Sequence, residues 1–502
     1  WFFMVGRIPG RFLLSRELLL INPGGGSTIY QGLARDVAAV EPPLWVRLIG
    51  GYVRDKGHDV RILDVNAEGL SPQETARRVL EHSPALICVV AHGHQPSAST
   101  QSMEPAGAIC RAIKAIDHNI PTIIVGGHVA ALPELTLAQE DVDFACNSEG
   151  PVTVLGLLES IKTGSSWESV PGLVFRDGET IRINSAPPLL DMNDLRGDVW
   201  DLLPMNAYRA HNWQVLGGSP RHPYASIHTS LSCPFSCSFC MIDAPFKASE
   251  PRKYRTRNPA DVVNEIDFLH RMYETKTFKI VDEMFVLSPK HYVPICEGLA
   301  VKPYASELNI WAYARVDTVK EGHLPLLRRA GIRWLALGIE SGSAHVRDGA
   351  DKAFSEEDIV STVRAIQAAG INIIGNFIFG LPDDTHVSMR ATLDLAMRLN
   401  CEFANFYSAM AYPGSKLFED ADPDDLPTAW SGYSQHSADC RPLPNGALSS
   451  ADILEFRDAA FREYFSNPRY LDMIERKFGM AAQNEIVSMS ARPLIRDLAK
   501  VA

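Results

Sequence analysis

Leu231-Ser232-Cys233-Pro234-Phe235-Ser236-Cys237-Ser238-Phe239-Cys240 is the stretch that decides the fold, because it spaces three cysteines as Cys-x3-Cys-x2-Cys. Three thiolates can hold three irons of a [4Fe-4S] cluster and leave the fourth iron open to a chelating ligand. An open iron is typical of chemistry at a cluster rather than of electron storage. Cys233, Cys237 and Cys240 are therefore predicted to be metal ligands within a catalytic centre.

Zinc and disulfides are the other uses of cysteine to consider. A structural zinc site usually takes four ligands in two pairs, and no second pair lies nearby in the sequence. Disulfides are disfavoured, since nine cysteines is an odd number and we expect no secretory signal peptide. The other six cysteines are scattered singly: Cys88, Cys110, Cys146, Cys296, Cys401 and Cys440.

The composition limits the classes of protein that the chain can form. Its 502 residues predict roughly three domains at ~150 residues each. With 46% hydrophobic and 22% charged residues the chain can bury full cores, and no apolar run reaches the ~18 residues that a membrane helix needs. We therefore expect a cytoplasmic monomer without a membrane partner.

The charge argues against nucleic acid as a partner. The net charge is −12 and the isoelectric point is about 5.7, whereas a general nucleic-acid binder usually carries a basic excess or stripe. The basic run at residues 252–257 is expected to be a solvated loop before the next helix. Residues 1–10 show no clear period and are expected to be a ragged start.

Residues 17–164 alternate apolar runs with helical stretches, which is typical of a doubly wound, Rossmann-like α/β domain. In such sheets the ligand lies beyond the carboxyl ends of the strands. A glycine-rich or polar turn follows each predicted strand, so these turns should meet at one edge. The predicted strands are 18–23, 60–65, 85–90, 122–128 and 142–145, with one helix ending near residue 56 and another reaching residue 162.

Two groups of residues resemble one known family. The cysteine spacing, with Phe239 before the last cysteine, resembles the radical S-adenosylmethionine (SAM) superfamily. Asn22-Pro23 at a strand end, Gly126-Gly127-His128 after the fourth strand and Glu149-Gly150 before a helix resemble the cobalamin-binding domain found ahead of radical SAM domains. The chain is thus similar to cobalamin-dependent radical SAM enzymes, which implies three cofactors: a [4Fe-4S] cluster, SAM and cobalamin.

The pattern from residue 225 to 420 fits the partial (β/α)6 TIM-type barrel of the radical SAM fold, with the cysteine loop directly after the first strand. Residues 165–224 contain several prolines and a hairpin around Asp177-Gly178, and are expected to be a linker. Residues 421–502 are expected to be mainly helical, with an amphipathic helix over 453–465. The predicted barrel strands are 225–230, 277–283, 309–315, 334–343, 372–382 and 402–407.

Polar residues at the barrel's strand ends are candidates for binding SAM, which presents an ammonium, a carboxylate and ribose hydroxyls. Acids suit the ammonium or the hydroxyls, and Arg315 suits the carboxylate. Two structural alternatives stay open: Arg315 pairs locally with Asp317, or Glu340 caps the following turn. The strand-end candidates are Asp282, Glu283, Arg315, Glu340, Ser341 and Asn376, and the resemblance implies that Phe239, Tyr412 and Pro413 border the adenine of SAM.

The resemblance also implies residues for cobalamin. The D-x-H-x-x-G motif, which provides an imidazole to cobalt in that family, is absent here, so cobalamin is expected without a histidine from that motif. Arg47 and His92 are further residues that could approach cobalt, and His128 also fits a purely positional role. The candidates are Asn22, Pro23, Trp45, His94, Gln95, Gly126, Gly127, His128, Glu149 and Gly150.

The resemblance implies a methyltransferase that moves a methyl group from methylcobalamin to an unactivated carbon, or to phosphorus, of a small molecule through a 5′-deoxyadenosyl radical. A flavodoxin or ferredoxin would supply the electron. A cyclase or ring-rearranging enzyme on the same architecture is the nearer alternative, and a non-catalytic corrinoid-binding protein is the more distant one. A tRNA methylthiolating enzyme is disfavoured, because no second cysteine set and no small RNA-binding domain are visible.

Overall fold

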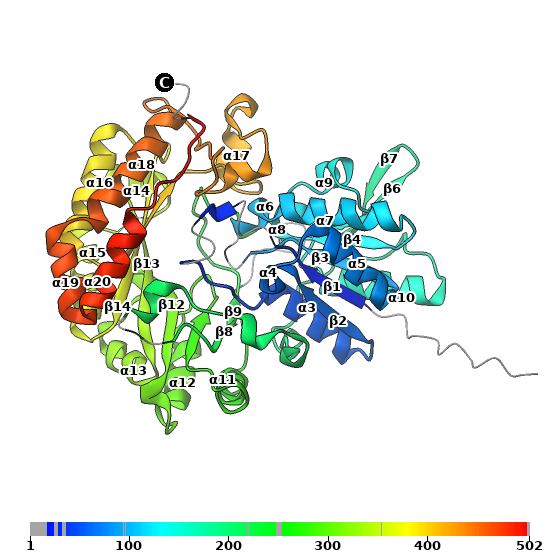
Figure 1. Ribbon diagram of the computed structural model, residues 1–502, viewed down its shortest axis with the longest axis horizontal. Helices are drawn as coiled ribbons and strands as arrows, with labels where there is room; N and C mark the ends of the chain where they lie inside the picture. Colours follow the sequence, from blue (N-terminus) through cyan, green and yellow to red (C-terminus); the bar gives the residue numbers. More distant parts are fainter. Residues whose placement is uncertain are drawn as a thin grey trace, which may run out of the picture.

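The computed structural model describes residues 18–24, 29–32, 37–93, 95, 97–216, 218, 220–246, 254–352 and 354–498. Two α/β units lie side by side, the amino-terminal domain on the right of Figure 1 and the barrel on the left. Among the described residues no helix is long and apolar enough to cross a bilayer. Residues 1–10, the glycine turn at 25–27 and His94 lie outside the described residues.

The amino-terminal domain is a sheet of seven strands in the order β2-β1-β3-β4-β5-β6-β7. The first five strands in the sequence pair in parallel, and every residue of β1 is buried, as in sheets covered on both faces. The strands are β1 (Leu18–Asn22), β2 (Val60–Asp64), β3 (Leu86–Val90), β4 (Thr122–Val125), β5 (Phe144–Cys146), β6 (Leu173–Asp177) and β7 (Thr180–Ile183).

Helices cover both faces of this sheet. On one face α3 and α10 pack against Leu18, Leu20 and Cys88, and on the other α5 and α7 pack against Leu19 and Ile87. The predicted helix up to about residue 56 is confirmed for its second half as α3. The helices are α3 (Leu44–Asp55), α4 (Val65–Glu68), α5 (Pro72–His82), α6 (Ala98–Gln101), α7 (Met103–Ile116), α8 (Gly127–Ala131), α9 (Pro133–Gln139) and α10 (Pro151–Thr163).

The hairpin that was predicted within the linker belongs to this sheet. β6 pairs antiparallel with β5, with Phe175 opposite Phe144, and β7 follows at the edge. Phe175 and Val174 are buried in the sheet's two cores. The residues between the domains therefore do not form a plain linker, because burial of the hairpin's apolar side fixes it to the sheet.

The second unit is a half-barrel of six parallel strands in the order β15-β14-β13-β12-β11-β8. All six predicted barrel strands are confirmed, with ends shifted by a few residues. Since β8 and β15 do not pair, the barrel stays open between them. The strands are β8 (Tyr224–Ile227), β11 (Thr277–Ile280), β12 (Asn309–Arg315), β13 (Ile332–Glu340), β14 (Asn372–Phe379) and β15 (Phe403–Ser408).

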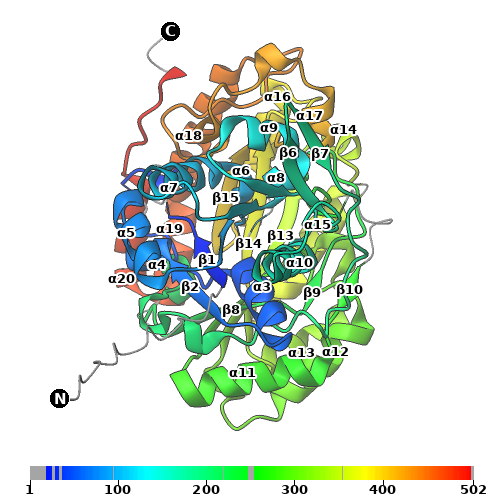
Figure 2. The same ribbon diagram turned by 90° about the vertical axis from the view of Figure 1, so that its right-hand side faces the viewer.

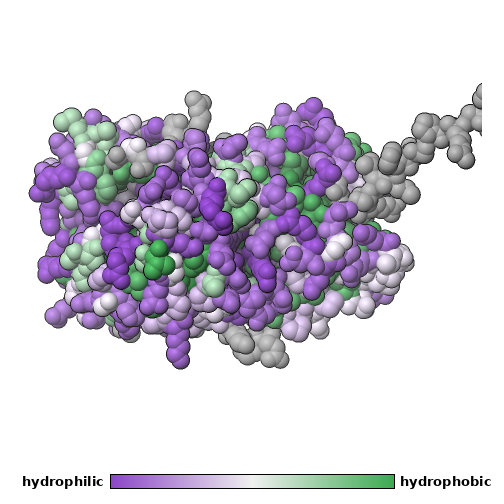
Figure 3. Space-filling model, turned by 90° about the horizontal axis from the view of Figure 1, so that it is seen from below, coloured by the Kyte–Doolittle hydropathy of each residue, from purple (hydrophilic) through white to green (hydrophobic). Residues whose placement is uncertain are grey.

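Helices surround the outside of the half-barrel, and Figure 2 shows the amino-terminal domain in front of its strands. The lower face in Figure 3 is mostly hydrophilic, with apolar residues in small groups. The helices are α11 (Pro259–Tyr273), α12 (Pro289–Ala300), α13 (Leu324–Arg329), α14 (Ala344–Gly349), α15 (Glu356–Ala368) and α16 (His386–Leu399).

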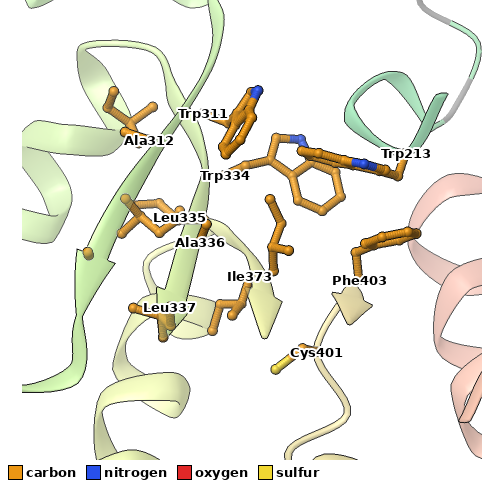
Figure 4. Packing of buried hydrophobic residues seen from close by; sticks show 14 of the residues in the cluster. Trp213, Trp311, Ala312, Trp334, Leu335, Ala336, Leu337, Ile373, Cys401 and Phe403 are labelled. Carbon is orange, nitrogen blue, oxygen red and sulfur yellow. The ribbon is translucent and has the colours of Figure 1, made fainter. Parts of the chain in front are cut away.

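The floor of the half-barrel is closed by Trp213, from the 3-10 turn η3 (Asn212–Val215). Its ring lies 5.4 Å from Trp311 and from Trp334, edge to face, and stacks on Phe403 at 5.5 Å. Figure 4 shows this aromatic group. Gln214 next to it donates from Nε2 to the carbonyl of Phe278 at 2.9 Å. The segment before the barrel is therefore part of the barrel's core.

The carboxyl-terminal region is helical, as predicted. Its amphipathic helix is α18 (Ser450–Phe465), which starts with Ser449 and Asp452 in a reciprocal capping box. Tyr464 on this helix donates to the carbonyl of Cys401 at 2.7 Å. The other helices are α17 (Lys416–Asp420), α19 (Pro468–Phe478) and α20 (Met480–Ser490).

Candidate active site between the two domains

The cysteine loop follows β9 (Ser230–Leu231), which pairs with β10 (Arg255–Thr256) at the carboxyl end of the barrel. All three cysteines are partly buried. Among the described residues no three His, Cys, Asp or Glu side chains gather around one metal ion. An iron–sulfur cluster needs its three sulfur ligands farther apart than a single metal ion does, because each thiolate binds a different iron.

Two cations beside the loop suit an anionic iron–sulfur cluster, whereas burial favours the neutral form of the free thiols. Burial raises the pKa of the Cys240 thiol to about 12, and the neighbouring sulfurs add to the rise. Burial also raises the pKa of Cys237, while the cations of Lys352 and Arg315 act in the opposite direction. Three thiols beside two cations are the donor set that would hold a thiolate-ligated cluster, since the cations offset its negative charge.

Arg315, predicted to bind the SAM carboxylate or to pair with Asp317, lies beside the loop. Its Nη1 is 3.9 Å from Cys237 Sγ, and its guanidinium stacks over the Phe235 ring at 3.7 Å. It also pairs with both carboxylate oxygens of Asp317, at 3.0 and 3.1 Å. The ion pair between Arg315 and Asp317 is therefore present, and it holds the guanidinium of Arg315 beside the cysteine loop.

Glu340 sits at an irregularity between β13 and β14, with φ of 64°. This left-handed conformation is uncommon outside glycine, and it turns the carboxylate toward Lys352, with which it forms a buried ion pair. Lys352 was not among the sequence candidates. It comes from the loop after α14, and no motif marks it, although a lysine that is only 5% exposed is rare unless paired.

Ser341 and Asn376 are held in hydrogen bonds. Ser341 Oγ lies 3.1 Å from Thr392 Oγ1, and Asn376 accepts at Oδ1 from Asn405 at 2.9 Å. Phe239 packs in a small apolar group with Ile378. Contacts with neighbouring residues therefore hold Ser341, Asn376 and Phe239 in place around the site.

Asp282 and Glu283 at the end of β11 differ in environment. Asp282 accepts from Thr229 N, Thr229 Oγ1 and Ser230 Oγ at 2.5–2.6 Å, so its oxygens are occupied. Within the described part of the chain, Glu283 Oε2 is buried without a hydrogen-bond partner. Burial raises the pKa of Glu283 to about 8. Glu283 is thus an uncharged carboxyl near neutral pH that lines a cavity.

The turn at Tyr412-Pro413 also lies against the cysteine loop. A Cβ on Gly414 would stand 2.8 Å from Ala244 Cβ and 3.1 Å from Ala131 Cβ, and its φ is 92°. Only glycine fits there easily. The turn therefore touches the loop after the cysteines and the amino-terminal domain at once, close to where it was predicted to border SAM.

A cleft separates the cysteine loop from the edge of the amino-terminal sheet. One cavity, with an empty volume of about 790 Å³ including its open mouth, reaches Asn22 and Pro23. A second, of about 460 Å³ measured in the same way, reaches Glu283 and Met241. The two cavities share part of their walls, so they adjoin each other between the predicted cofactor sites. The shared residues are Leu44, Trp45, His92 and Gly93.

Trp45 and His92 form the centre of this wall, with ring centroids 4.7 Å apart in a stacked arrangement. Burial lowers the pKa of His92 to about 3, so the imidazole is neutral. Its Nε2 has no hydrogen-bond partner among the described residues. Of the residues expected to approach cobalt, these two line the cleft, whereas Arg47 does not: it is buried against Glu265 at 2.7 Å and Trp200 at 3.4 Å.

The glycine pair brings the backbone close to other parts of the protein, whereas its approach to a corrin edge stays a prediction. A Cβ on Gly126 would lie 2.4 Å from the carbonyl oxygen of Ala91, and one on Gly127 would lie 3.3 Å from Met241 Cε. His128 has the positional role: it is 1% exposed and packs edge to face on Trp430 at 4.3 Å.

The remaining candidates of the amino-terminal domain join it to the barrel. Glu149 forms a buried ion pair with Arg255 of β10, and Gln95 donates from Nε2 to Tyr313 Oη at 2.6 Å. Gly150, with φ of 107°, packs where a Cβ would meet Val125 at 2.7 Å. Glu149 and Gly150 line neither of these two cavities, and their part in cobalamin binding stays a prediction.

Comparison with known proteins agrees with this geometry. A B12-binding domain model matches residues 30–158, and a radical SAM superfamily model matches residues 227–396. An uncharacterized methyltransferase of Pyrococcus horikoshii is 27% identical over 82% of this chain and 84% of its own. The anaerobic magnesium-protoporphyrin IX monomethyl ester cyclase of Rubrivivax gelatinosus is 24% identical, over 97% of this chain and 85% of its own.

A solved structure has the same fold. The radical SAM methyltransferase TsrM of Kitasatospora setae, with tryptophan and a SAM analogue bound, superposes with a TM-score of 0.66 at 18% identity and covers 95% of this chain and 99% of its own. The B12-binding domain, the cysteine loop on a half-barrel and the cleft between them therefore place this chain among the cobalamin-dependent radical SAM enzymes.

Proposed function

We propose that the chain is a methyltransferase acting on an unactivated carbon, or on phosphorus, of a small molecule. The observation that carries this proposal is the pair of adjoining cavities between the cysteine loop and the edge of the B12-binding sheet. When bound, SAM at the cluster supplies a 5′-deoxyadenosyl radical and cobalamin supplies a methyl group. The protein's task is to hold both cofactors against one substrate atom and to exclude water.

Each cofactor has its own residues in this proposal. Cys233, Cys237 and Cys240 hold the cluster, while Arg315 and the Glu340–Lys352 pair provide charges beside SAM. Trp45 and His92 border the corrin, and the backbone at Gly127 lets it approach the loop that carries Met241. Glu283, whose Oε2 has no hydrogen-bond partner among the described residues, can donate or accept one proton in the cleft.

Cyclisation is the second candidate, because the Rubrivivax cyclase aligns over nearly the whole chain. Methyl transfer consumes one SAM for the methyl group and a second for the radical, so S-adenosylhomocysteine must form in step with product. Cyclisation forms none. An electron donor of the flavodoxin or ferredoxin class and a cytoplasmic setting complete the proposal.

The test uses holoprotein reconstituted anaerobically with iron, sulfide and hydroxocobalamin, a chemical reductant and methyl-labelled SAM. We expect a reduced cluster signal perturbed by SAM in electron paramagnetic resonance, together with 5′-deoxyadenosine and S-adenosylhomocysteine. Cys237→Ala should abolish 5′-deoxyadenosine, whereas Cys296→Ala, which removes a buried thiol of α12, should retain it. Absence of 5′-deoxyadenosine from the wild type and from both variants would support the non-catalytic corrinoid-binding alternative, and 5′-deoxyadenosine without S-adenosylhomocysteine would support cyclisation.

A further inference from the structure

A third cavity opens on the flank of the half-barrel, away from the cleft. It has an empty volume of about 1030 Å³, including its mouth, and runs along β15 from Phe403 to Tyr407. β15 is the last strand of the sheet, so this cavity lies at the gap that the unpaired edges of the half-barrel leave. Residues of α18 and α20 form its outer wall, and Val37, Ala38 and His211 form the opposite wall.

The lining is mainly apolar and aromatic. Trp213, held by Trp334 and Phe403, forms the inner end. Tyr407 is 36% exposed, which leaves its ring open to a ligand, and Phe461 lies across the cavity on α18. Large flat walls with a few polar groups are typical of pockets for small molecules that contain a ring system.

The charges around this cavity favour an anion. Arg457, Arg462 and Arg492 line it, against one acid, Asp458. Asp458 is already neutralised, because it pairs with Arg457 at 2.6 Å and with Arg496 at 2.8 Å. Arg462 on the solvent side of α18 is exposed, so it stands where a carboxylate or phosphate group would emerge.

The cavity also leads toward the reaction site. Asn405, on its wall, donates to Asn376 on the neighbouring strand at 2.9 Å. Tyr30 lines both this cavity and the cofactor cleft, and its ring lies 5.6 Å from His436. A molecule held on the flank therefore has one end at the solvent and the other beside the cleft.

We propose that this flank cavity binds the body of the substrate: an apolar ring system that lies between Trp213 and Tyr407, with an anionic group at Arg462. This assignment rests on the proposed function, because it takes the cleft as the place of reaction. It names the substrate class as an amphipathic, ring-containing anion rather than a small polar metabolite.

The test measures binding of two fluorescent dyes to the cofactor-loaded protein, without turnover. One is the anion 1-anilinonaphthalene-8-sulfonate, and the other is its uncharged counterpart N-phenyl-1-naphthylamine. Ser490→Trp should fill the cavity from α20 and weaken both dyes at least tenfold, whereas Ser488→Trp, exposed on the same helix and outside the cavity, should change neither. Arg462→Glu should weaken the anionic dye about tenfold and the uncharged dye less than twofold, and Arg469→Glu should serve as the exposed control.

The outcomes separate this assignment from the proposed function. Equal dye binding by Ser490→Trp and Ser488→Trp would overturn the flank cavity as a binding site, and equal losses of both dyes in Arg462→Glu would overturn the anionic class. Formation of 5′-deoxyadenosine is measured separately, after reductant and SAM are added to the same protein variants. If it is absent throughout, the proposed function fails, whereas the dye comparison still decides whether the cavity binds ring-containing anions.

Discussion

Strand ends serve different purposes in the two domains. In the barrel, Arg315 and Glu340 turn toward the cysteine loop, where their charges meet the predicted cluster. In the B12-binding domain, Glu149 and Gln95 at equivalent places reach across to the barrel instead. A polar residue at the carboxyl end of a parallel strand can thus lie beside the reaction site or join the two domains. The residue with which it pairs, rather than its position on the strand, determines its role.

The strongest test of the docking role is the buried charge group at the domain junction. Glu265 pairs with Arg47 at 2.7 Å and with Arg257 at 2.6 Å. Glu265→Gln would leave two buried arginines without a counter-charge, so we expect a loss of about 3–5 kcal/mol in the free energy of unfolding. The measurement is denaturant unfolding of the cofactor-free protein. Glu307→Gln, in the exposed pair with Lys276, is the control and should cost about 0–1 kcal/mol. Equal losses of unfolding free energy in the two variants would show that the charge group at the junction does not stabilise the fold more than an exposed pair does.

The ion pair between Glu149 and Arg255 should have the next largest effect. Both side chains are 7% exposed, and Glu149→Gln leaves charge-assisted hydrogen bonds unmade at a cost of about 1.5–3 kcal/mol. We expect cobalamin affinity to change less than stability, because Glu149 does not line the cleft. A variant that keeps its stability but loses cobalamin would instead make Glu149 a cofactor residue.

His128, which packs on Trp430, should make the stability of the protein depend on pH. Burial lowers the pKa of His128 to about 3, below the value of about 6.5 in the unfolded chain. The unfolded state therefore binds a proton that the folded state does not, so stability falls as the pH drops below about 6.5, by at most about 2 kcal/mol at pH 5. His128→Phe keeps a ring against Trp430 and should show a smaller fall between pH 7.5 and pH 5. An unchanged slope would mean that His128 does not titrate on unfolding.

The smallest effect is expected at Gln95. Gln95→Leu removes its hydrogen bond to Tyr313 and should cost about 0.5–1.5 kcal/mol. Since both residues lie between the domains, we expect faster proteolysis of the junction with 5′-deoxyadenosine formation retained. Loss of SAM cleavage in a stable Gln95→Leu variant would show that Gln95 takes part in the reaction and does not only join the two domains.

The sequence predicted the elements that depend on local pattern. Fully buried parallel strands such as β1 form continuous apolar runs, and the cysteine loop has a fixed spacing. The six barrel strands and α18 followed from the same kind of signal. Local pattern was sufficient there because each segment's own side chains determine its structure.

Pairings between distant residues could not be predicted in this way. Glu149 meets Arg255 across 106 positions, and Lys352 reaches Glu340 from a loop without a motif. The hairpin of β6 and β7 looked like part of a linker, since nothing in its own residues shows that it extends the sheet. Such contacts depend on how the domains fold around one another.

The segment between the domains has a consequence for how molecules reach the cleft. One end of this segment forms strands β6 and β7 of the B12-binding sheet. The other end packs into the floor of the barrel through Trp213 and Gln214. Because this connection is anchored at both ends, we expect little hinge motion between the two domains. A substrate would then enter from the side, and its thickness would be limited by the width of the space between the domains.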